Sequence, residues 1–406
     1  METSSAGDPG APWSAIAETS AATPGAVVRR SNTALIVGLL RSRGPSTRAE
    51  LVRASGLARP TVMAIVTALV QAGVVLESGT RRPADLPSPR GGRPGTLLSF
   101  NGAVATVVGA QLHRGGVTMR QVTADGRTVL ESLVGTSATG VQEVGDVLAA
   151  EVERFADTAN PPAAIGLSLP GLLDHGRVTL PGAGWYDEPL QDILQARTGI
   201  PVALMSPATA ATAGERSAGV ARDHDDVVLV HSARGIAAGV LAGGRLLRGS
   251  GGAFGELGHC PVGADATCRC GRRGCLETVA GEWAVRDRLA ALGLTVSTAE
   301  NLADLDRRAD PRVDAVTADA ARALGTATAW MVNLLNPSLV VLADTPLTRG
   351  AGRFRDVFAE AVLEHSVSTV GLDVVGGTED AVLLGAVQAA LELLPSPVRP
   401  ELVLGR

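Results

Sequence analysis

The stretch Gly255–Glu277, GELGHCPVGADATCRCGRRGCLE, is the most specific segment of this 406-residue chain. It holds all four cysteines, Cys260, Cys268, Cys270 and Cys275, next to His259. Disulfide frameworks belong to short secreted domains, so a tight cysteine cluster in a long chain favours a metal site. Imidazole and thiolates are the usual ligands of tetrahedral zinc, and four protein ligands indicate a structural site. The residues alone allow either His259 or Cys260 as the fourth ligand.

Strand and helix patterns alternate on both sides of this segment. Apolar strands are expected at residues 106–110, 117–122, 164–169, 227–231 and 236–241, with a helix near 141–155. Residues 323–343 carry no charge, but Asn333, Asn336 and Pro337 divide them into an amphipathic helix and a buried strand, so we expect no transmembrane segment. The alternation predicts an α/β body.

A helical pattern precedes this body. One helix is expected from Ser31 to residue 44, a short helix follows the capping box Thr47–Glu50, a third helix covers residues 59–72, and a strand covers 74–77. This order is typical of a winged helix-turn-helix. The third helix would then be the recognition helix, and we expect three side chains at its start to reach the DNA: Arg59, Thr61 and Met63.

The distribution of charge agrees with a DNA-binding head. Residues 28–95 contain 11 arginines and three acidic residues, whereas the rest of the chain contains 25 arginines and 38 acidic residues. A basic head on an acidic body is expected where only the head contacts nucleic acid. Arg90 and Arg93, in the sequence RGGRP, could enter an A·T-rich minor groove, but Gly-Gly is equally typical of a tight turn in the wing.

Taken together, these segments resemble the ROK family, which comprises repressors, open reading frames and sugar kinases. The resemblance covers roughly residues 30–395, and the cysteine loop is its most specific part. Further matches are Ser168-Leu-Pro-Gly171, Gly199-Ile-Pro-Val202, Gly235-Ile-Ala-Ala-Gly239, Asn333-Leu-Leu-Asn-Pro337 and Leu384-Gly-Ala386. The winged helix, with Arg30-Ser-Asn32 and Gly92-Arg-Pro94, is similar to the regulator branch rather than to the free-standing kinases.

The resemblance implies a two-lobed, actin-like (ribonuclease H-like) α/β body behind the winged helix. It assigns the structural zinc to His259, Cys268, Cys270 and Cys275, which leaves Cys260 as a small buried hydrophobe. It also places the family's ligand-binding residues at Glu256, His259 and Glu277. The expected partners are a double-stranded DNA operator, a carbohydrate-type effector and further copies of the chain, in a homodimer or homotetramer.

Three segments depart from the family's kinases. The first phosphate loop reads Gln111-Leu-His-Arg-Gly115 where the kinases have Asp-x-Gly-Gly-Thr. The catalytic aspartate position falls on Pro207 within Ser206-Pro-Ala-Thr209, and the second phosphate loop reads Ala233-Arg-Gly235. Proline cannot accept the proton of a sugar hydroxyl, and the loss of a general base alone typically lowers the rate by ~10²–10⁴. We therefore expect no kinase activity.

We expect five segments: a disordered tail (1–27), a winged helix (28–80), a wing and linker (81–96), a ROK domain whose C-terminal helix returns to the first lobe (97–395), and a short tail (396–406). The first tail has no apolar core of a signal peptide, so a cytoplasmic location is expected. The predicted function is a DNA-binding transcriptional regulator, a repressor, with a degenerate kinase site. The alternatives are a sugar kinase fused to a winged helix, and a ligand-free dimeric DNA-binding protein.

Overall fold

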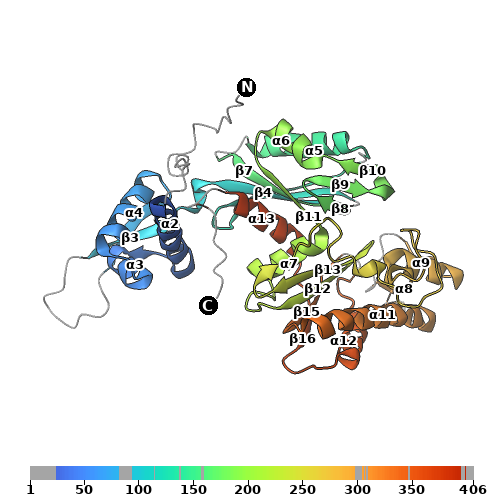
Figure 1. Ribbon diagram of the computed structural model, residues 1–406. Coiled ribbons are helices and arrows are strands. Elements are labelled where there is room, and N and C mark those ends of the chain that lie inside the picture. Colours follow the sequence, from blue (N-terminus) through green and yellow to red (C-terminus); the bar gives the residue numbers. More distant parts are fainter. Residues whose placement is uncertain are drawn as a thin grey trace.

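The computed structural model describes residues 24–81, 94–113, 115–136, 139–156, 160–297, 304–305, 307, 310–345, 348–394 and 398. These residues form a winged-helix head and a two-lobed α/β body (Figure 1). Within them, no helix has the length and apolar character needed to cross a bilayer. The expected fold class is confirmed.

The head consists of three helices and a small antiparallel sheet. Helices α2 (Pro24–Arg43), α3 (Arg48–Ser55) and α4 (Arg59–Gln71) precede strands β2 (Val75–Arg81) and β3 (Gly95–Phe100), and β3 also pairs with the two-residue β1 (Ser46–Thr47). The predicted capping box is present, because Thr47 and Glu50 each accept the other's backbone amide. Gly56 ends α3 in the left-handed conformation that glycine adopts without strain.

Two limits of the head differ from the sequence expectation. α2 begins at Pro24 rather than at Ser31, and proline is well suited to the first turn of a helix. β3 pairs with β2 from Gly95↔Arg81 to Phe100↔Val75, so the sheet of the head extends to Phe100, whereas the sequence places the start of the body at residue 97. The physical reason is that β2 alone would leave its ladder of amides and carbonyls without partners.

The first lobe is built on a five-stranded sheet in the order β11-β7-β4-β5-β6. Its strands are β4 (Thr106–His113), β5 (Gly116–Thr123), β6 (Thr128–Val134), β7 (Pro162–Ser168) and β11 (Val202–Met205). Helices α5 (Val141–Ala156) and α6 (Leu190–Thr198) cover one face, where Val108 and Ala110 of β4 join their core. The other face, with Val107, packs against α13 (Ala381–Leu393), so the last helix returns to the first lobe. A small sheet of β8 (Leu172–Asp174), β9 (Arg177–Leu180) and β10 (Trp185–Glu188) flanks this lobe.

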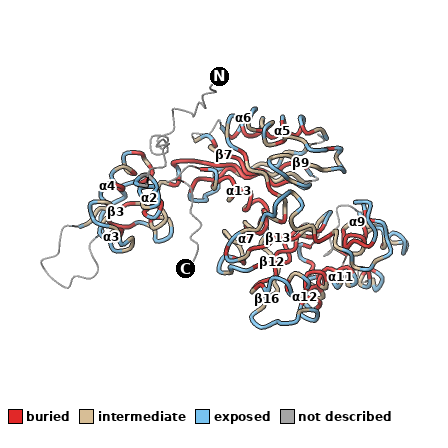
Figure 2. Tube along the Cα trace, viewed as in Figure 1, coloured by how far each residue is buried: buried red, intermediate tan, exposed pale blue. Residues whose placement is uncertain are grey.

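The second lobe repeats this plan with the order β14-β13-β12-β15-β16. Its strands are β12 (Val227–Ser232), β13 (Ile236–Ala242), β14 (Arg245–Leu246), β15 (Leu339–Leu342) and β16 (Asp373–Gly376). Val228 and Val230 point toward the core shared with α8 (Glu277–Ala280), α9 (Glu282–Ala291), α11 (Pro311–Leu335) and α12 (Gly352–His365). Val227 and Leu229 point to the opposite face, toward α7 (Pro207–Ala218). Successive side chains of a strand alternate between faces, so both faces of this sheet are buried (Figure 2).

Helices α7 and α13 cross between the two lobes and pack against each other without large side chains (Figure 1). A Cβ atom on Gly214 would lie 1.9 Å from the carbonyl oxygen of Ala381, and one on Gly385 would lie 1.7 Å from that of Ala210. Only glycine allows two helices to approach this closely at these positions. The close packing of α7 against α13 therefore joins the two lobes.

Candidate metal centre, ligand site and nucleic-acid surface

The structure brings together the four residues predicted to bind metal. One potential ligand atom from each of His259, Cys268, Cys270 and Cys275 lies within 4.8 Å of all the others. His259 Nδ1 is 3.6 Å from Cys268 Sγ, and the Sγ atoms of Cys270 and Cys275 are 3.7 Å apart. Zinc–nitrogen and zinc–sulfur bonds of about 2.1 and 2.3 Å imply ligand–ligand separations of about 3.6 and 3.8 Å in a tetrahedron. The cluster therefore has the donor set and spacing to hold a metal ion.

The loop around this cluster is shaped by its own backbone. Pro261 and Thr267 bridge to Cys275 and Arg273, respectively, which folds the segment into a narrow hairpin. At its tip, the amide of Gly271 donates to the carbonyl of Cys268, and Gly271 has a φ of 86°. A side chain would strain this turn, so glycine allows the thiols on either side of it to converge.

Cys260 lies outside the cluster. It is half-buried and packs against the core of the second lobe, while the cluster of possible metal ligands does not include it. The structure thus favours His259 among the two alternatives that the residues alone left open.

The three residues predicted to bind a ligand lie beside the metal cluster. The second ring nitrogen of His259, Nε2, is 3.7 Å from Glu256 Oε2, so the nitrogen that does not face the cysteines faces a carboxylate. Glu277 begins α8 and is buried, and its Oε1 accepts the amide of Ile236 at 2.9 Å. Burial raises the pKa of Glu256, the imidazole of His259 opposes that shift, and the charge of Glu277 adds to it.

The segment at the catalytic position of the kinases is the start of a helix. Ser206 caps α7: its Oγ accepts the amide of Thr209 at 3.3 Å and lies 2.9 Å from the hydroxyl oxygen of Thr209. Pro207 occupies the first turn, where its missing amide costs no hydrogen bond. These four residues begin a helix and offer no carboxylate.

The two segments at the phosphate-loop positions also have local roles. His113 ends β4, its Nε2 is 2.9 Å from Thr118 Oγ1, and its Nδ1 accepts the amide of Gly115. Burial lowers the pKa of His113, which favours the neutral ring. Between β12 and β13, Arg234 is exposed at the edge of the second sheet. Neither segment has the run of glycine amides that cradles phosphates.

The candidate DNA surface is the exposed face of α4. Val62, Ile65, Val66 and Leu69 are buried in the head, whereas Arg59 and Met63 lie one turn apart and are exposed. Met63 is 39% exposed, and Thr61 is half-buried at the margin of this face. No side chain caps the first amides of α4, which leaves donors available to a phosphate group.

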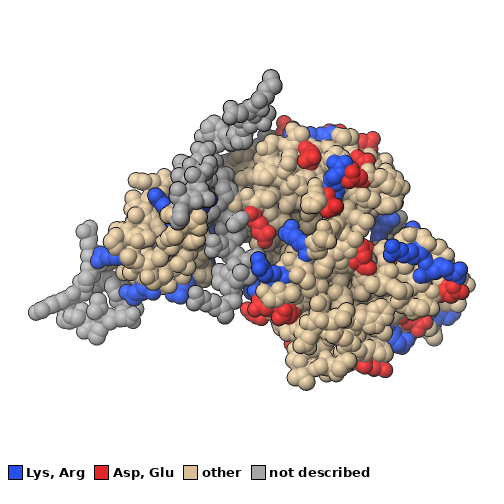
Figure 3. All heavy atoms as spheres, in the orientation of Figure 1, with Lys and Arg blue, Asp and Glu red and all other residues tan. Residues whose placement is uncertain are grey.

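The other parts of the predicted DNA surface are only partly within the described residues. Arg90 and Arg93 lie outside them. Figure 3 shows arginines spaced along the head, whereas basic and acidic side chains are mixed on the body. Two arginines near α4 are held by acidic residues of the head: Arg48 binds Glu77 at 2.9 Å, and Arg81 lies 3.5 Å from Glu50. Surface ion pairs of this kind contribute little to stability, so both arginines could leave their carboxylates and contact phosphate groups of DNA.

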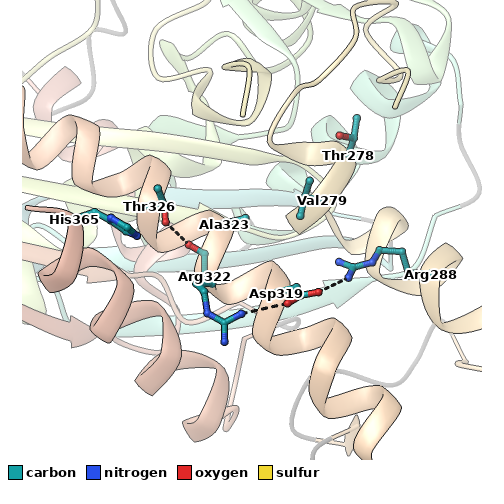
Figure 4. A pocket seen from close by; sticks show the side chains of 8 residues that line it. All are labelled: Thr278, Val279, Arg288, Asp319, Arg322, Ala323, Thr326 and His365. Carbon is teal, nitrogen blue, oxygen red and sulfur yellow. Dashed lines mark hydrogen bonds and ion pairs between the residues drawn. The ribbon is translucent and has the colours of Figure 1, made fainter. Parts of the chain in front are cut away.

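A separate cavity of about 510 Å³ opens on the second lobe (Figure 4). Asp319 lies between two arginines of its wall, 2.9 Å from Arg288 and 3.2 Å from Arg322. The remaining residues that line the cavity are Thr278, Val279, Ala323, Thr326 and His365. None of the residues predicted to bind a ligand lines this cavity, and its acidic and basic groups neutralise one another in part.

Sequence reasoning missed a buried carboxylate at the crossing of the lobes. Glu215 of α7 has no exposed surface, its Oε2 accepts the hydroxyl of Thr378 at 2.8 Å, and its Oε1 accepts the amide of Thr378. Arg120 of β5 binds Asp380 at 2.8 Å, just before α13. No local pattern marks these residues, because their partners lie far away in the sequence.

Comparison with known proteins follows the same division of the chain. A sequence profile of the ROK family matches residues 114–348. The chain is 28% identical over 332 residues to the xylose repressor of Bacillus subtilis (strain 168), covering 78% of this chain and 83% of that protein.

Two solved structures extend the comparison to the fold. A ROK family transcriptional regulator, a homologue of the Escherichia coli Mlc protein, is 26% identical with a TM-score of 0.75, covering 89% of this chain and 95% of its own. A ROK hexokinase from Thermus thermophilus is 31% identical with a TM-score of 0.61, covering 70% of this chain and 97% of its own. The extra part matched by the regulator is about the size of the head.

Proposed function

Because the chain belongs to the ROK family, we propose that it is a DNA-binding transcriptional repressor whose body binds a carbohydrate-type ligand without phosphorylating it. The observation that carries this proposal is that Arg59 and Met63 are exposed at the start of a helix whose apolar residues are buried in a winged-helix head. Relatives named as repressors support it, as does the wider coverage by a transcriptional regulator than by a hexokinase. A genomic selection experiment tests it: the proposal requires a specific, salt-sensitive footprint.

The residues beside the metal cluster and at the kinase base position support sugar binding without phosphoryl transfer. Glu256, His259 and Glu277 keep the carboxylates and the imidazole that can accept hydrogen bonds from sugar hydroxyls. At the position of the kinase base, Pro207 offers no proton acceptor on its side chain. The Gln111–Gly115 and Ala233–Gly235 segments lack the amide cradle that phosphoryl transfer requires.

We expect no sugar-dependent ATP hydrolysis. In a coupled assay over a panel of hexoses, the protein should show no turnover above that of a Glu256→Ala control, because base and phosphate loops are both missing. The Thermus thermophilus hexokinase serves as the positive control. Turnover that depends on Glu256 would establish the alternative of a kinase fused to a winged helix.

We expect effector sensing to depend on Glu256. Operator titrations with and without sugars, N-acetylated sugars and phosphorylated sugars should identify a ligand that changes operator affinity about 5–150-fold, the range of a coupling of ~1–3 kcal/mol. In Glu256→Gln this response should be lost, since the amide keeps the shape but removes the charged acceptor. Glu153→Gln, an exposed acid of α5, is the matched control.

The contrary result would be equally informative. If no metabolite changes the affinity, or if Glu256→Gln responds as the wild type does, the body is a ligand-free dimerisation scaffold. Ser206 and Pro207 replace the family's Asn-Asp pair, and the nearby hydroxyls of Ser206 and Thr209 are engaged with each other. The loss of the Asn-Asp pair favours a ligand different from the family's hexoses. A modified or phosphorylated sugar that binds near the exposed Arg234 is one candidate.

The metal in this proposal is zinc, and its role is structural. Three thiolates and one imidazole fill a tetrahedral shell, which leaves no open position for a substrate. Bound through Nδ1, the metal would orient the His259 ring so that Nε2 faces the ligand beside Glu256. The active form is a homodimer or homotetramer, because a winged-helix repressor reads two half-sites with two heads.

A further inference from the structure

The head and the first lobe share one hydrophobic core, although the sequence predicts a wing and linker between them. Ile36, Val37 and Leu40 of α2 belong to the same buried cluster as Val107 and Val122 of the first sheet. The C-terminal part of the chain joins this cluster through Ala390, Leu391, Leu394 and Val398. Figure 2 shows buried segments continuing from the first sheet toward the head. The head is therefore packed onto the body and is not held by the covalent connection alone.

Arg41, near the end of α2, lies where three parts of the chain meet. Its Nη2 donates to the carbonyl oxygen of Ala124 in the first lobe at 3.1 Å, and to that of Val398 at 2.6 Å. Its guanidinium carbon is 4.1 Å from the centre of the Phe100 ring, at the last residue of the head. One side chain thus contacts the head, the first lobe and the C-terminal segment.

These contacts suit arginine in particular. A planar guanidinium can stack on an aromatic face while its edge donates to two carbonyl groups, which a lysine ammonium cannot do in one position. Burial lowers the pKa of Arg41 to about 10, and the carboxylate of Asp125 opposes this shift. The side chain is still charged at pH 7, so its charge lies in a place where it must be satisfied by these partners.

Helix α13 connects the contacts of Arg41 to the place where α7 and α13 pack against each other between the lobes. At its beginning, Asp380 binds Arg120 and the adjoining Thr378 binds Glu215 of α7. At its other end, Leu391 and Leu394 are buried in the core that contains the head. A change in the angle between the lobes therefore acts on the element against which the head is packed.

We propose that Arg41 is a positioning residue that fixes the winged-helix head to the first lobe, so that both move as one rigid body when the protein engages DNA. This inference rests on the proposed DNA-binding function. A head fixed in this way has a preset position and is not held by a flexible linker. The entropic cost of placing two heads on two half-sites at once is then lower.

The test compares Arg41→Met with Arg43→Met by hydrogen exchange. Methionine keeps the apolar stem against Phe100 but removes both hydrogen bonds. Arg43 lies on the same helix and is exposed, so its replacement controls for the lost charge and the lost helix residue. We expect amides of residues 34–41 and 387–394 to exchange at least tenfold faster in Arg41→Met, with α5 and α11 unchanged. Equal exchange in the two variants would overturn the proposal, and so would faster exchange throughout the chain.

A second readout separates positioning from folding. On an operator with two half-sites, selected with the wild-type protein, Arg41→Met should bind roughly tenfold more weakly, whereas binding to a duplex with one half-site should change less than about twofold. An equal loss on both duplexes would contradict a positioning role, because damage to the head lowers both affinities alike. If the wild-type protein binds no DNA, the proposed function fails, and the exchange experiment still decides whether Arg41 fixes the head.

Discussion

Replacing His259 with alanine is expected to release the metal and to lower the melting temperature of the second lobe. Structural zinc contributes ~10–16 kcal/mol of apparent binding free energy in small zinc-binding peptides, and this energy is available only in the folded state. Loss of even ~3 kcal/mol would lower the melting temperature of a unit this size by roughly 6–12 °C. Cys268 and Cys275 are buried, so loss of the metal would leave two thiols inside the fold without their ligand. Metal analysis and thermal denaturation with and without a chelator measure both effects.

The matched control is Cys260→Ser, which removes a neighbouring thiol that is not part of the cluster. It should retain one zinc per chain and lose at most the small contribution of a half-buried side chain to the core. The reverse pattern, with zinc lost from Cys260→Ser and retained by His259→Ala, would make Cys260 the fourth ligand. Loss of zinc should also abolish any effector response, because His259 belongs to both sites.

The features that could be predicted from the sequence are those with local causes. Thr47 and Glu50 satisfy each other's amides three residues apart, and Pro60 and Gly73 mark the ends of α4. The candidate metal ligands fall within one short segment, so their spacing alone indicates that they meet. Apolar runs predicted strands β4, β5, β7, β12, β13 and β15, whereas β6, β11, β14 and β16 were not predicted.

The features that sequence reasoning missed depend on contacts between distant residues. Arg41 is 83 residues from Ala124 and 357 residues from Val398, and Glu215 is 163 residues from Thr378. In the sequence, Arg41 is one basic residue among many in the head, and nothing nearby indicates that it is half-buried. The position of the head on the body follows from such pairs, so it required the tertiary structure.

The wing illustrates the same limit. The stretch rich in glycine, proline and arginine after residue 80 is typical of a linker, and this pattern hides the strand that follows it. Gly95–Phe100 becomes part of the head because β2 and β1 offer it partners on both sides. Strand pairing of this kind is set by tertiary context more than by local sequence.

Replacing Arg59 with alanine is expected to reduce operator affinity and to relax sequence preference at one base pair of each half-site. Arg59 lies at the first turn of α4, exposed and aligned with Met63 on the face that a recognition helix turns toward the major groove. A bidentate arginine–guanine contact contributes about 1–3 kcal/mol of discrimination, which corresponds to roughly 5–150-fold in affinity. Binding to unrelated DNA should change little, since it depends on phosphate contacts.

Two variants distinguish base reading from charge. Arg154→Ala removes the same charge from an exposed helix position on the first lobe and should leave operator affinity unchanged. Arg90→Ala combined with Arg93→Ala should weaken operators with A·T-rich flanks most, because arginine is attracted to a narrow minor groove. Affinity should also fall steeply as salt rises, since each phosphate contact releases counterions. If Arg59→Ala lowers affinity equally for every sequence, Arg59 contacts the phosphate backbone, and the bases are read by other residues of α4.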